Sequence, residues 1–422
     1  MKLFSTTALA LAFVIPSVSA SAQSYGPQPQ PQTQQQAPRA AEPAQKGAQP
    51  SVKPSGKALK AIVDLQTAVN KSDVASVPAK VAAAEAVAST KEDRYLIGQL
   101  QLKAALNAKD NAATAAAIDR IAGSGYLDAG KIAELYLSLG STFYNAKNFP
   151  LAQAAFQKAI AADPRNGEAQ GLLGEALLSQ GQKAEAAAAF QRAVQARVAA
   201  GQKPDESLVK RAVGVAYEAK SPGAVELARQ WVAAYPSPAS WSDAVAIYQN
   251  LNHPDVEGML ALYRLMHATN AIKNGGGYAQ YARIAAEQNN FNEAQLALDA
   301  GVSSKLLDPG KAEYADLVKG LKTKPKATAA DLAEATRTAQ SGMALLRIGD
   351  RYYAMGDYAK AVELYRKAMG KPGVDTSVAN LHIGMALARS GDKTGAATAL
   401  NAVSGTYAEI AKFWLLYANS AV

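Results

Sequence analysis

The chain has 422 residues, of which 49% are hydrophobic and 19% charged, and its formal net charge is +9. These proportions are typical of a folded chain and exclude one that is disordered throughout. Cysteine is absent, which excludes a disulfide framework and a cysteine nucleophile. The three histidines, His253, His267 and His382, do not share a metal-ligand spacing such as i and i+4 on a helix. We therefore predict no metal site, no cofactor and no catalytic residue.

Residues 1–22 have the composition of a cleavable signal peptide. Lys2 gives a positive start, residues 8–15 form a short apolar core, and Pro16 ends it. Small residues at Ala20 and Ala22 then provide two cleavage sites for signal peptidase. An apolar core this short cannot span a bilayer; a buried N-terminal helix is the alternative. We expect a periplasmic or secreted protein with no transmembrane segment after signal removal.

Residues 23–56 are predicted to be a disordered spacer. They include the run PQPQPQTQQQAP and almost no aliphatic side chain. Such a segment cannot bury enough apolar surface to fold, and its prolines favour an extended coil. A proline-rich recognition ligand is the alternative interpretation.

Residues 57–132 are predicted to form degenerate N-terminal helical repeats. They are rich in alanine, which has the highest helix propensity, and they contain short Lys-Ser-Asp and Lys-Asp-Asn turns. The predicted helices cover residues 58–70, 75–89, 94–108 and 112–122.

Residues 133–200 contain two adjacent copies of one 34-residue pattern, residues 133–166 and 167–200. The recurring positions are Leu139-Gly140 and Leu173-Gly174, Ala152 and Ala186, Phe156 and Phe190, and Ala159 and Ala193. A fixed period of this length predicts helix–turn–helix units, each too small to bury its apolar face alone. The glycines and alanines permit close helix approach, and Pro164 ends the second helix of the first unit. Val198 replaces this proline in the second unit, so its helix is expected to continue further.

At these offsets the pattern resembles the tetratricopeptide repeat family, in which Leu-Gly, an aromatic, Ala, an aromatic, Ala and Pro recur. The resemblance implies an all-α fold, an α-solenoid (superhelix) of stacked antiparallel helix pairs of about 34 residues. A weaker third unit, with Gly214 and Tyr217, extends the repeats over residues 133–236.

The remaining sequence fits the same architecture less evenly. Residues 237–340 are interpreted as degenerate helical repeats, residues 341–404 as two better copies, and residues 405–422 as a C-terminal capping helix. Gly275–Gly277 lack the Lys-Ser/Thr of a phosphate-binding loop and are interpreted as a hinge between units.

The resemblance also implies a partner-binding face on the first helix of each unit. At the positions that reach this face in the family the chain has Glu134, Leu137, Ser141, Tyr144, Asn145, Glu168, Glu175, Leu178, Ser179, Arg211 and Glu218. The Lys and Asn that clamp a terminal carboxylate in some members are replaced by Leu137 and Ser141, and by Gly171 and Glu175. Four glutamates against one arginine favour a neutral or basic partner segment. The face of Tyr352 and Tyr353 is the alternative location.

These observations predict an exported scaffold, not an enzyme, that binds a protein or peptide partner in the cell envelope. One alternative is an envelope assembly factor that contacts glycan or anionic lipid head groups, because the positive charge suits anionic envelope material better than nucleic acid. The other is a cell-wall or polysaccharide enzyme with a helical superstructure. The poorly matched residues 241–340 are where a second site would be sought.

Overall fold

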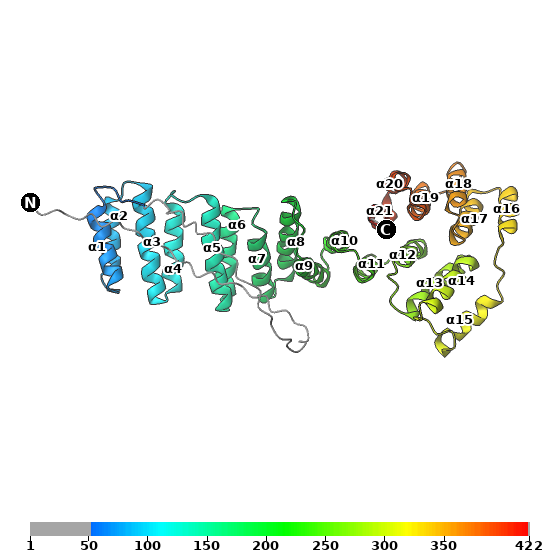
Figure 1. Ribbon diagram of the computed structural model, residues 1–422, viewed down its shortest axis with the longest axis horizontal. Coiled ribbons are helices and arrows are strands. Elements are labelled where there is room, and N and C mark those ends of the chain that lie inside the picture. Colours follow the sequence, from blue (N-terminus) through cyan, green and yellow to red (C-terminus); the bar gives the residue numbers. More distant parts are fainter. Residues whose placement is uncertain (1–51, 421–422) are drawn as a thin grey trace, which may run out of the picture. The chain divides into compact units, whose positions relative to one another are not determined.

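The computed structural model of the protein describes residues 52–420 (Figure 1). The predicted signal peptide and residues 23–51 of the predicted spacer lie outside the described residues. Within residues 52–420 every regular element is a helix and no strand occurs. The predicted all-α fold of successive helices is therefore confirmed.

The chain divides into two compact units. Among the described residues, the first contains residues 52–147 and 161–164, and the second contains residues 148–160 and 165–420. The helices of the first unit are α1 (Leu59–Asn70), α2 (Val77–Val87), α3 (Lys91–Ala108), α4 (Asn111–Gly123) and α5 (Ala129–Asn145). The bounds of α1–α4 agree with the predicted helices to within three residues.

Asp93 fixes the start of the first unit. Its carboxylate accepts hydrogen bonds from the Ser55 backbone N (2.8 Å) and Oγ (2.8 Å), the Ser89 N (3.0 Å) and the Thr90 N (3.1 Å). Burial raises the pKa of Asp93, but these hydrogen bonds outweigh burial and lower the pKa to about 2. Ser55, which lies inside the predicted spacer, is thus held against α3, so the folded part begins before residue 57.

The second unit contains the remaining helices, of which α6 also has residues in the first unit. They are α6 (Phe149–Ala162), α7 (Gly167–Ser179), α8 (Lys183–Ala199), α9 (Glu206–Glu218), α10 (Ala224–Ala234), α11 (Pro238–Asn252), α12 (Val256–Ala268), α13 (Gly275–Glu287), α14 (Phe291–Ser303), α15 (Ala312–Lys322), α16 (Ala329–Thr338), α17 (Gly342–Ala354), α18 (Tyr358–Met369), α19 (Thr376–Ser390), α20 (Lys393–Asn401) and α21 (Ala408–Asn419). Neighbouring helices pack as pairs in α7/α8, α9/α10, α11/α12, α13/α14, α17/α18 and α19/α20.

The α7/α8 pair has the close packing that the repeat pattern predicts. A Cβ atom at Gly174 would lie 3.0 Å from three ring atoms of Phe190, which is itself 2% exposed. Ala186 is fully buried on the facing side of α8. Helix α8 continues to Ala199, past Val198, as expected from the missing proline.

We expect Gly174→Leu to lower the free energy of unfolding by about 1–3 kcal/mol, because the new side chain overpacks against Phe190. The matched control is Gly214→Leu in α9, where a Cβ meets no atom within 4 Å. That substitution should be neutral or stabilise by up to about 1 kcal/mol, since leucine favours the helix more than glycine does. Urea denaturation measures both, and equal effects would contradict the packing register.

Residues 312–338 depart from the predicted repeats. Helix α15 packs against α13 and α14, whereas α16 packs against α17, so the two do not form a helix pair. Few of their side chains are buried: Tyr314 and Leu321 in α15, and Leu332 in α16. This small apolar surface explains why the pairing is lost here.

The hinge predicted at Gly275–Gly277 is wrong. These residues form the first turn of α13, which is capped by the Asn274 side chain. A Cβ at Gly275 would lie 2.6 Å from the Leu306 carbonyl oxygen. Glycine is therefore required for close approach of the segment that follows α14.

Helix α21 contacts more than the end of the helix array. It packs against α19 and α20, as a terminal cap would, but also against α10 and α12 (Figure 1). The Trp414 indole Nε1 donates to the Ala261 carbonyl oxygen (3.1 Å), and the Phe413 ring meets Tyr248 edge-on at 5.9 Å. Both Phe413 and Trp414 are fully buried. The segment from α10 to α21 therefore closes on itself, because these aromatic side chains find their partners on α11 and α12.

Candidate functional site

The predicted partner-binding residues lie on the first helices of the repeats. Glu134, Ser141, Tyr144 and Asn145 are on α5 in the first unit, while Glu175 and Ser179 on α7 and Arg211 and Glu218 on α9 belong to the second.

Within the second unit, Glu175 and Arg211 form a two-point ion pair between neighbouring first helices. The Arg211 Nε and Nη2 each lie 2.9 Å from a different Glu175 carboxylate oxygen. Glu218 pairs with Lys183 of α8 at 2.9 Å. In the first unit, Glu134 pairs with Lys131 at 2.8 Å. Three of the four glutamates thus have a basic neighbour, which reduces the acidic character predicted for this face.

The other predicted residues differ in exposure. Asn145 and Ser179 are exposed, and Tyr144 is half-buried. The Ser141 hydroxyl donates to the Leu137 carbonyl oxygen (2.9 Å) on its own helix. Asn145 and Ser179 are therefore uncharged polar side chains that are open to a partner.

A second group of charged residues, which the sequence analysis missed, is buried among α12, α14, α17 and α19. At its centre the Arg264 Nε and Nη2 each lie 2.7 Å from a Glu293 carboxylate oxygen, and both side chains are 0% exposed. Glu293 also accepts hydrogen bonds from the Tyr281 hydroxyl (2.8 Å) and the Asn290 Nδ2 (2.8 Å). Each carboxylate oxygen of Glu293 thus has two donors.

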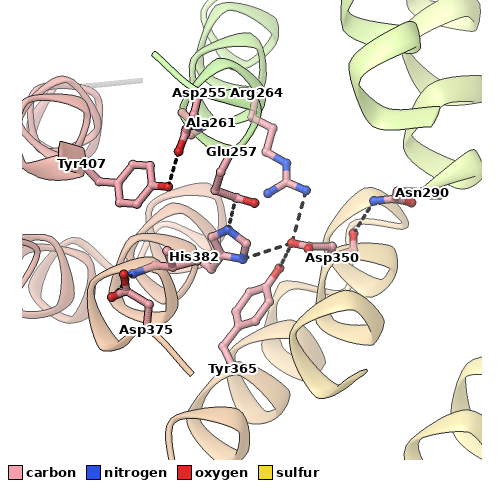
Figure 2. Close-up of polar contacts among 12 residues, drawn as sticks. Asp255, Glu257, Ala261, Arg264, Asn290, Asp350, Tyr365, Asp375, His382 and Tyr407 are labelled. Carbon is pink, nitrogen blue, oxygen red and sulfur yellow. Dashed lines mark hydrogen bonds and ion pairs between the residues drawn. The ribbon is translucent and has the colours of Figure 1, made fainter. Parts of the chain in front are cut away.

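Asp350 joins this pair to His382 (Figure 2). Its Oδ1 lies 3.2 Å from the Arg264 Nη2, 2.9 Å from the Tyr365 hydroxyl and 3.2 Å from the His382 Nδ1. The other ring nitrogen of His382, Nε2, lies 2.5 Å from the Glu257 Oε1. We call Glu257, Arg264, Glu293, Asp350 and His382 the buried charge network.

The network sets the charge states of its members. Burial lowers the pKa of His382, but the carboxylates of Asp350 and Glu257 outweigh burial and raise the pKa to about 10. Burial raises the pKa of Asp350, but the charges of His382 and Arg264 hold it well below its usual range. His382 is therefore a protonated, packed residue at neutral pH, and the network has two cations against three carboxylates.

The arrangement is suited to holding helices together. Arg264 and Glu293 have no exposed surface and bind each other, and of the Arg264 nitrogens only Nη1 has no hydrogen-bond partner. In residues 52–420 no group of three or more His, Cys, Asp or Glu side chains could hold a metal ion. No helix in that same range is long and apolar enough to cross a membrane. The signal that could have revealed the network is Arg264 itself, a charged residue inside the apolar run of residues 259–266.

The fold and the recurring small residues define a helical-repeat protein. A sequence profile of the tetratricopeptide repeat matches residues 137–200 and 346–409. These regions include α6–α8 and α18–α20 in full and most of α17. These two regions of the chain are therefore tetratricopeptide repeats.

Comparison with solved structures gives distant similarity. PilF of Pseudomonas aeruginosa is 17% identical, with 55% of this chain and 97% of that chain covered and a TM-score of 0.25. The C-terminal part of a tetratricopeptide repeat protein of Cytophaga hutchinsonii is 14% identical (68% and 98% covered, TM-score 0.25). Yeast Tom70 is 12% identical (85% and 87% covered, TM-score 0.21). These TM-scores are too low to transfer any arrangement or function, and no curated protein matches the chain.

Proposed function

We propose that this protein is an exported scaffold that binds a protein or peptide partner in the cell envelope. The observation that carries the proposal is the set of tetratricopeptide repeats whose first helices bear exposed polar side chains, such as Asn145 on α5 and Ser179 on α7. Repeats of this kind typically serve as interaction scaffolds and not as enzymes. We infer no catalytic activity.

Partner contacts are proposed on the first helices of each unit separately. On α5 they involve Glu134, Ser141, Tyr144 and Asn145. On α7 and α9 they involve Glu175, Ser179, Arg211 and Glu218. Because Arg211 holds Glu175 in a two-point pair, the partner meets a fixed carboxylate and guanidinium and not a mobile negative charge.

Export is proposed from the charged start, short apolar core and small-residue cleavage sites of residues 1–22. We expect the native protein to begin at Ser21 or Gln23 and to lie outside the inner membrane. Intact-mass measurement of the protein purified from fractionated cells checks this. A full-length chain in the cytoplasmic fraction would contradict export.

The triple variant Tyr144→Ala, Asn145→Ala, Glu175→Ala is expected to weaken capture of the natural partner without lowering thermal stability. Surface substitutions typically change stability by less than about 0.5 kcal/mol, whereas the loss of polar and aromatic contacts reduces affinity. Pull-down from envelope extract, followed by quantitative mass spectrometry, measures the captured amount. Separate Tyr144→Ala/Asn145→Ala and Glu175→Ala variants assign the loss to one unit or the other.

The matched control replaces three exposed residues of second helices, Gln157, Glu185 and Gln195, with alanine. It should capture as much partner as the native chain. Undiminished capture by the triple variant would move the site elsewhere. The alternative, contact with an anionic envelope component, is favoured by the net charge of +9. It would be supported if the native chain and the triple variant both sedimented with anionic vesicles to the same extent.

A further inference from the structure

A groove runs across the second unit beside the buried charge network. It consists of two hollows of about 520 Å³ and 190 Å³. Both are lined by His267, Leu296, Ala354 and Met355, so the hollows are continuous. We call it the α14–α17 groove, after the helices that carry Leu296 and Ala354.

The smaller hollow contains a cation without a counter-charge. Arg389 of α19 is half-buried, and its Nε donates to the Tyr358 hydroxyl (3.1 Å), with the guanidinium carbon 5.7 Å from the Tyr358 ring centre. No carboxylate of the described chain lies within ion-pair distance of Arg389. By contrast, the buried Arg229 and Arg264 each hold two carboxylates. Partial burial of an unpaired cation is unfavourable, and an incoming anion would relieve this.

An apolar floor lies next to this cation. Met355 is 45% exposed, and Leu296 and Ala354 are half-buried beside it. Methionine adapts its shape to different apolar partners. The groove therefore offers an apolar surface and, at one end, an oriented guanidinium.

His267, which lines both hollows, responds to the same charge. Burial lowers its pKa, and the positive charge of Arg389 lowers it further. His267 is therefore neutral at pH 7, and Arg389 supplies the positive charge of the smaller hollow.

We propose that the α14–α17 groove binds an extended peptide segment in which an acidic side chain pairs with Arg389 and a neighbouring apolar side chain packs on Met355. The charge complementarity is specific. The Nε of Arg389 donates to Tyr358, and its two terminal nitrogens can donate to both oxygens of one carboxylate. Tyr352 and Tyr353 are both buried, and Tyr353 lines the smaller hollow, so the alternative binding face near them lies at this groove. This second site depends on the proposed protein-binding function in one respect only: its ligand is also a peptide.

The test uses the full chain and arrays of acetylated, amidated nonapeptides. Each peptide has a Gly/Ser backbone and one Glu flanked by Leu, Met, Phe or Tyr, and a matched set has Gln in place of Glu. We expect the best Glu peptides to bind about tenfold more tightly than their Gln counterparts, the difference that one charge-assisted pair provides. Arg389→Gln should remove this preference.

Two further variants keep the test decisive. Arg366→Gln, which removes an exposed arginine of α18 outside the groove, should leave binding unchanged. Met355→Glu should also abolish the preference for Glu peptides, because it places a negative charge at an exposed position of the groove. Met355→Glu leaves the contact between Arg389 and Tyr358 in place. It therefore remains informative if the Arg389→Gln variant does not fold.

NMR titration gives an independent signature. Binding of a Glu peptide should raise the pKa of His267, because the carboxylate offsets the charge of Arg389, and Gln peptides should not do so. Equal binding of the two peptide sets, no binding by either, or a preference that survives Met355→Glu would overturn the proposal. Binding only of peptides with a free C-terminal carboxylate, or of anionic vesicles in their place, would also overturn it. The Tyr144, Asn145 and Glu175 triple variant should retain groove binding, so the two proposals can fail separately.

Discussion

Glu293→Gln is expected to lower the free energy of unfolding of the second unit by about 3–5 kcal/mol, the usual effect of removing one partner from a buried ion pair. The substitution leaves the Arg264 guanidinium, which has no exposed surface, with Asp350 as its only remaining carboxylate. The NH2 group of the new amide also replaces an acceptor oxygen, so it faces the donor of either Tyr281 or Asn290. Urea denaturation followed by tryptophan fluorescence measures the change, because Trp231, Trp241 and Trp414 all lie in this unit.

The chain provides a matched control for this substitution. Arg337 and Glu334 form the same two-point pair on α16, with distances of 3.0 and 2.7 Å, but their side chains are 75% and 59% exposed. Glu334→Gln should change stability by less than about 1 kcal/mol, because water solvates both groups. If both variants lose the same small amount of stability, water solvates the buried charge network in the folded protein.

Stability should fall as the pH rises from about 7 towards 10, because of His382. Its pKa is raised to about 10 in the folded state, whereas an unfolded histidine titrates near pH 6.5. The stabilisation is therefore fully present below about pH 6.5 and is lost as the pH passes through the folded pKa. Between these values only the folded state holds the proton, so the free energy of unfolding falls by about 1.4 kcal/mol per pH unit.

His382→Gln should flatten this slope between pH 7 and 9.5. The measurement compares urea denaturation of the two proteins at several pH values within that window, below the titration of unfolded tyrosine. Asp350 has the opposite effect on the pH dependence of stability. Its pKa is lowered in the folded state, so its contribution is lost only as the pH falls into the acid range. Parallel pH profiles for the native and variant proteins would show that His382 is not held protonated.

The local elements could be predicted because their determinants are close in sequence. Alanine-rich segments and polar turns located α1–α4, and the spacing of Gly174, Ala186 and Phe190 located the α7/α8 pair. The contacts that could not be predicted depend on residues brought together by folding. Arg264 stands among apolar neighbours, and Glu293 and Asp350 are 29 and 86 residues away from it. Sequence periodicity contains no information about such a pairing.

The candidate partner-binding residues show the same limit. Family positions placed Glu175, Arg211 and Glu218 on first helices correctly, but their charge balance depends on side chains that the position rule ignores. Lys183, on a second helix, pairs with Glu218. The net charge of a binding face is therefore a tertiary property, because it depends on which neighbouring helix brings a cation within reach.

The docking of α21 on α12 has a consequence for how the chain is made. In an open array each repeat interacts mainly with its neighbours, and folding can proceed from the first repeat as synthesis continues. Here Trp414 binds Ala261, which was synthesised 153 residues earlier. The apolar surfaces of α10 to α12 thus stay uncovered until α21 has been synthesised. Completion of this unit therefore waits for α21, whose docking determines when this hydrophobic surface is withdrawn from chaperones and proteases.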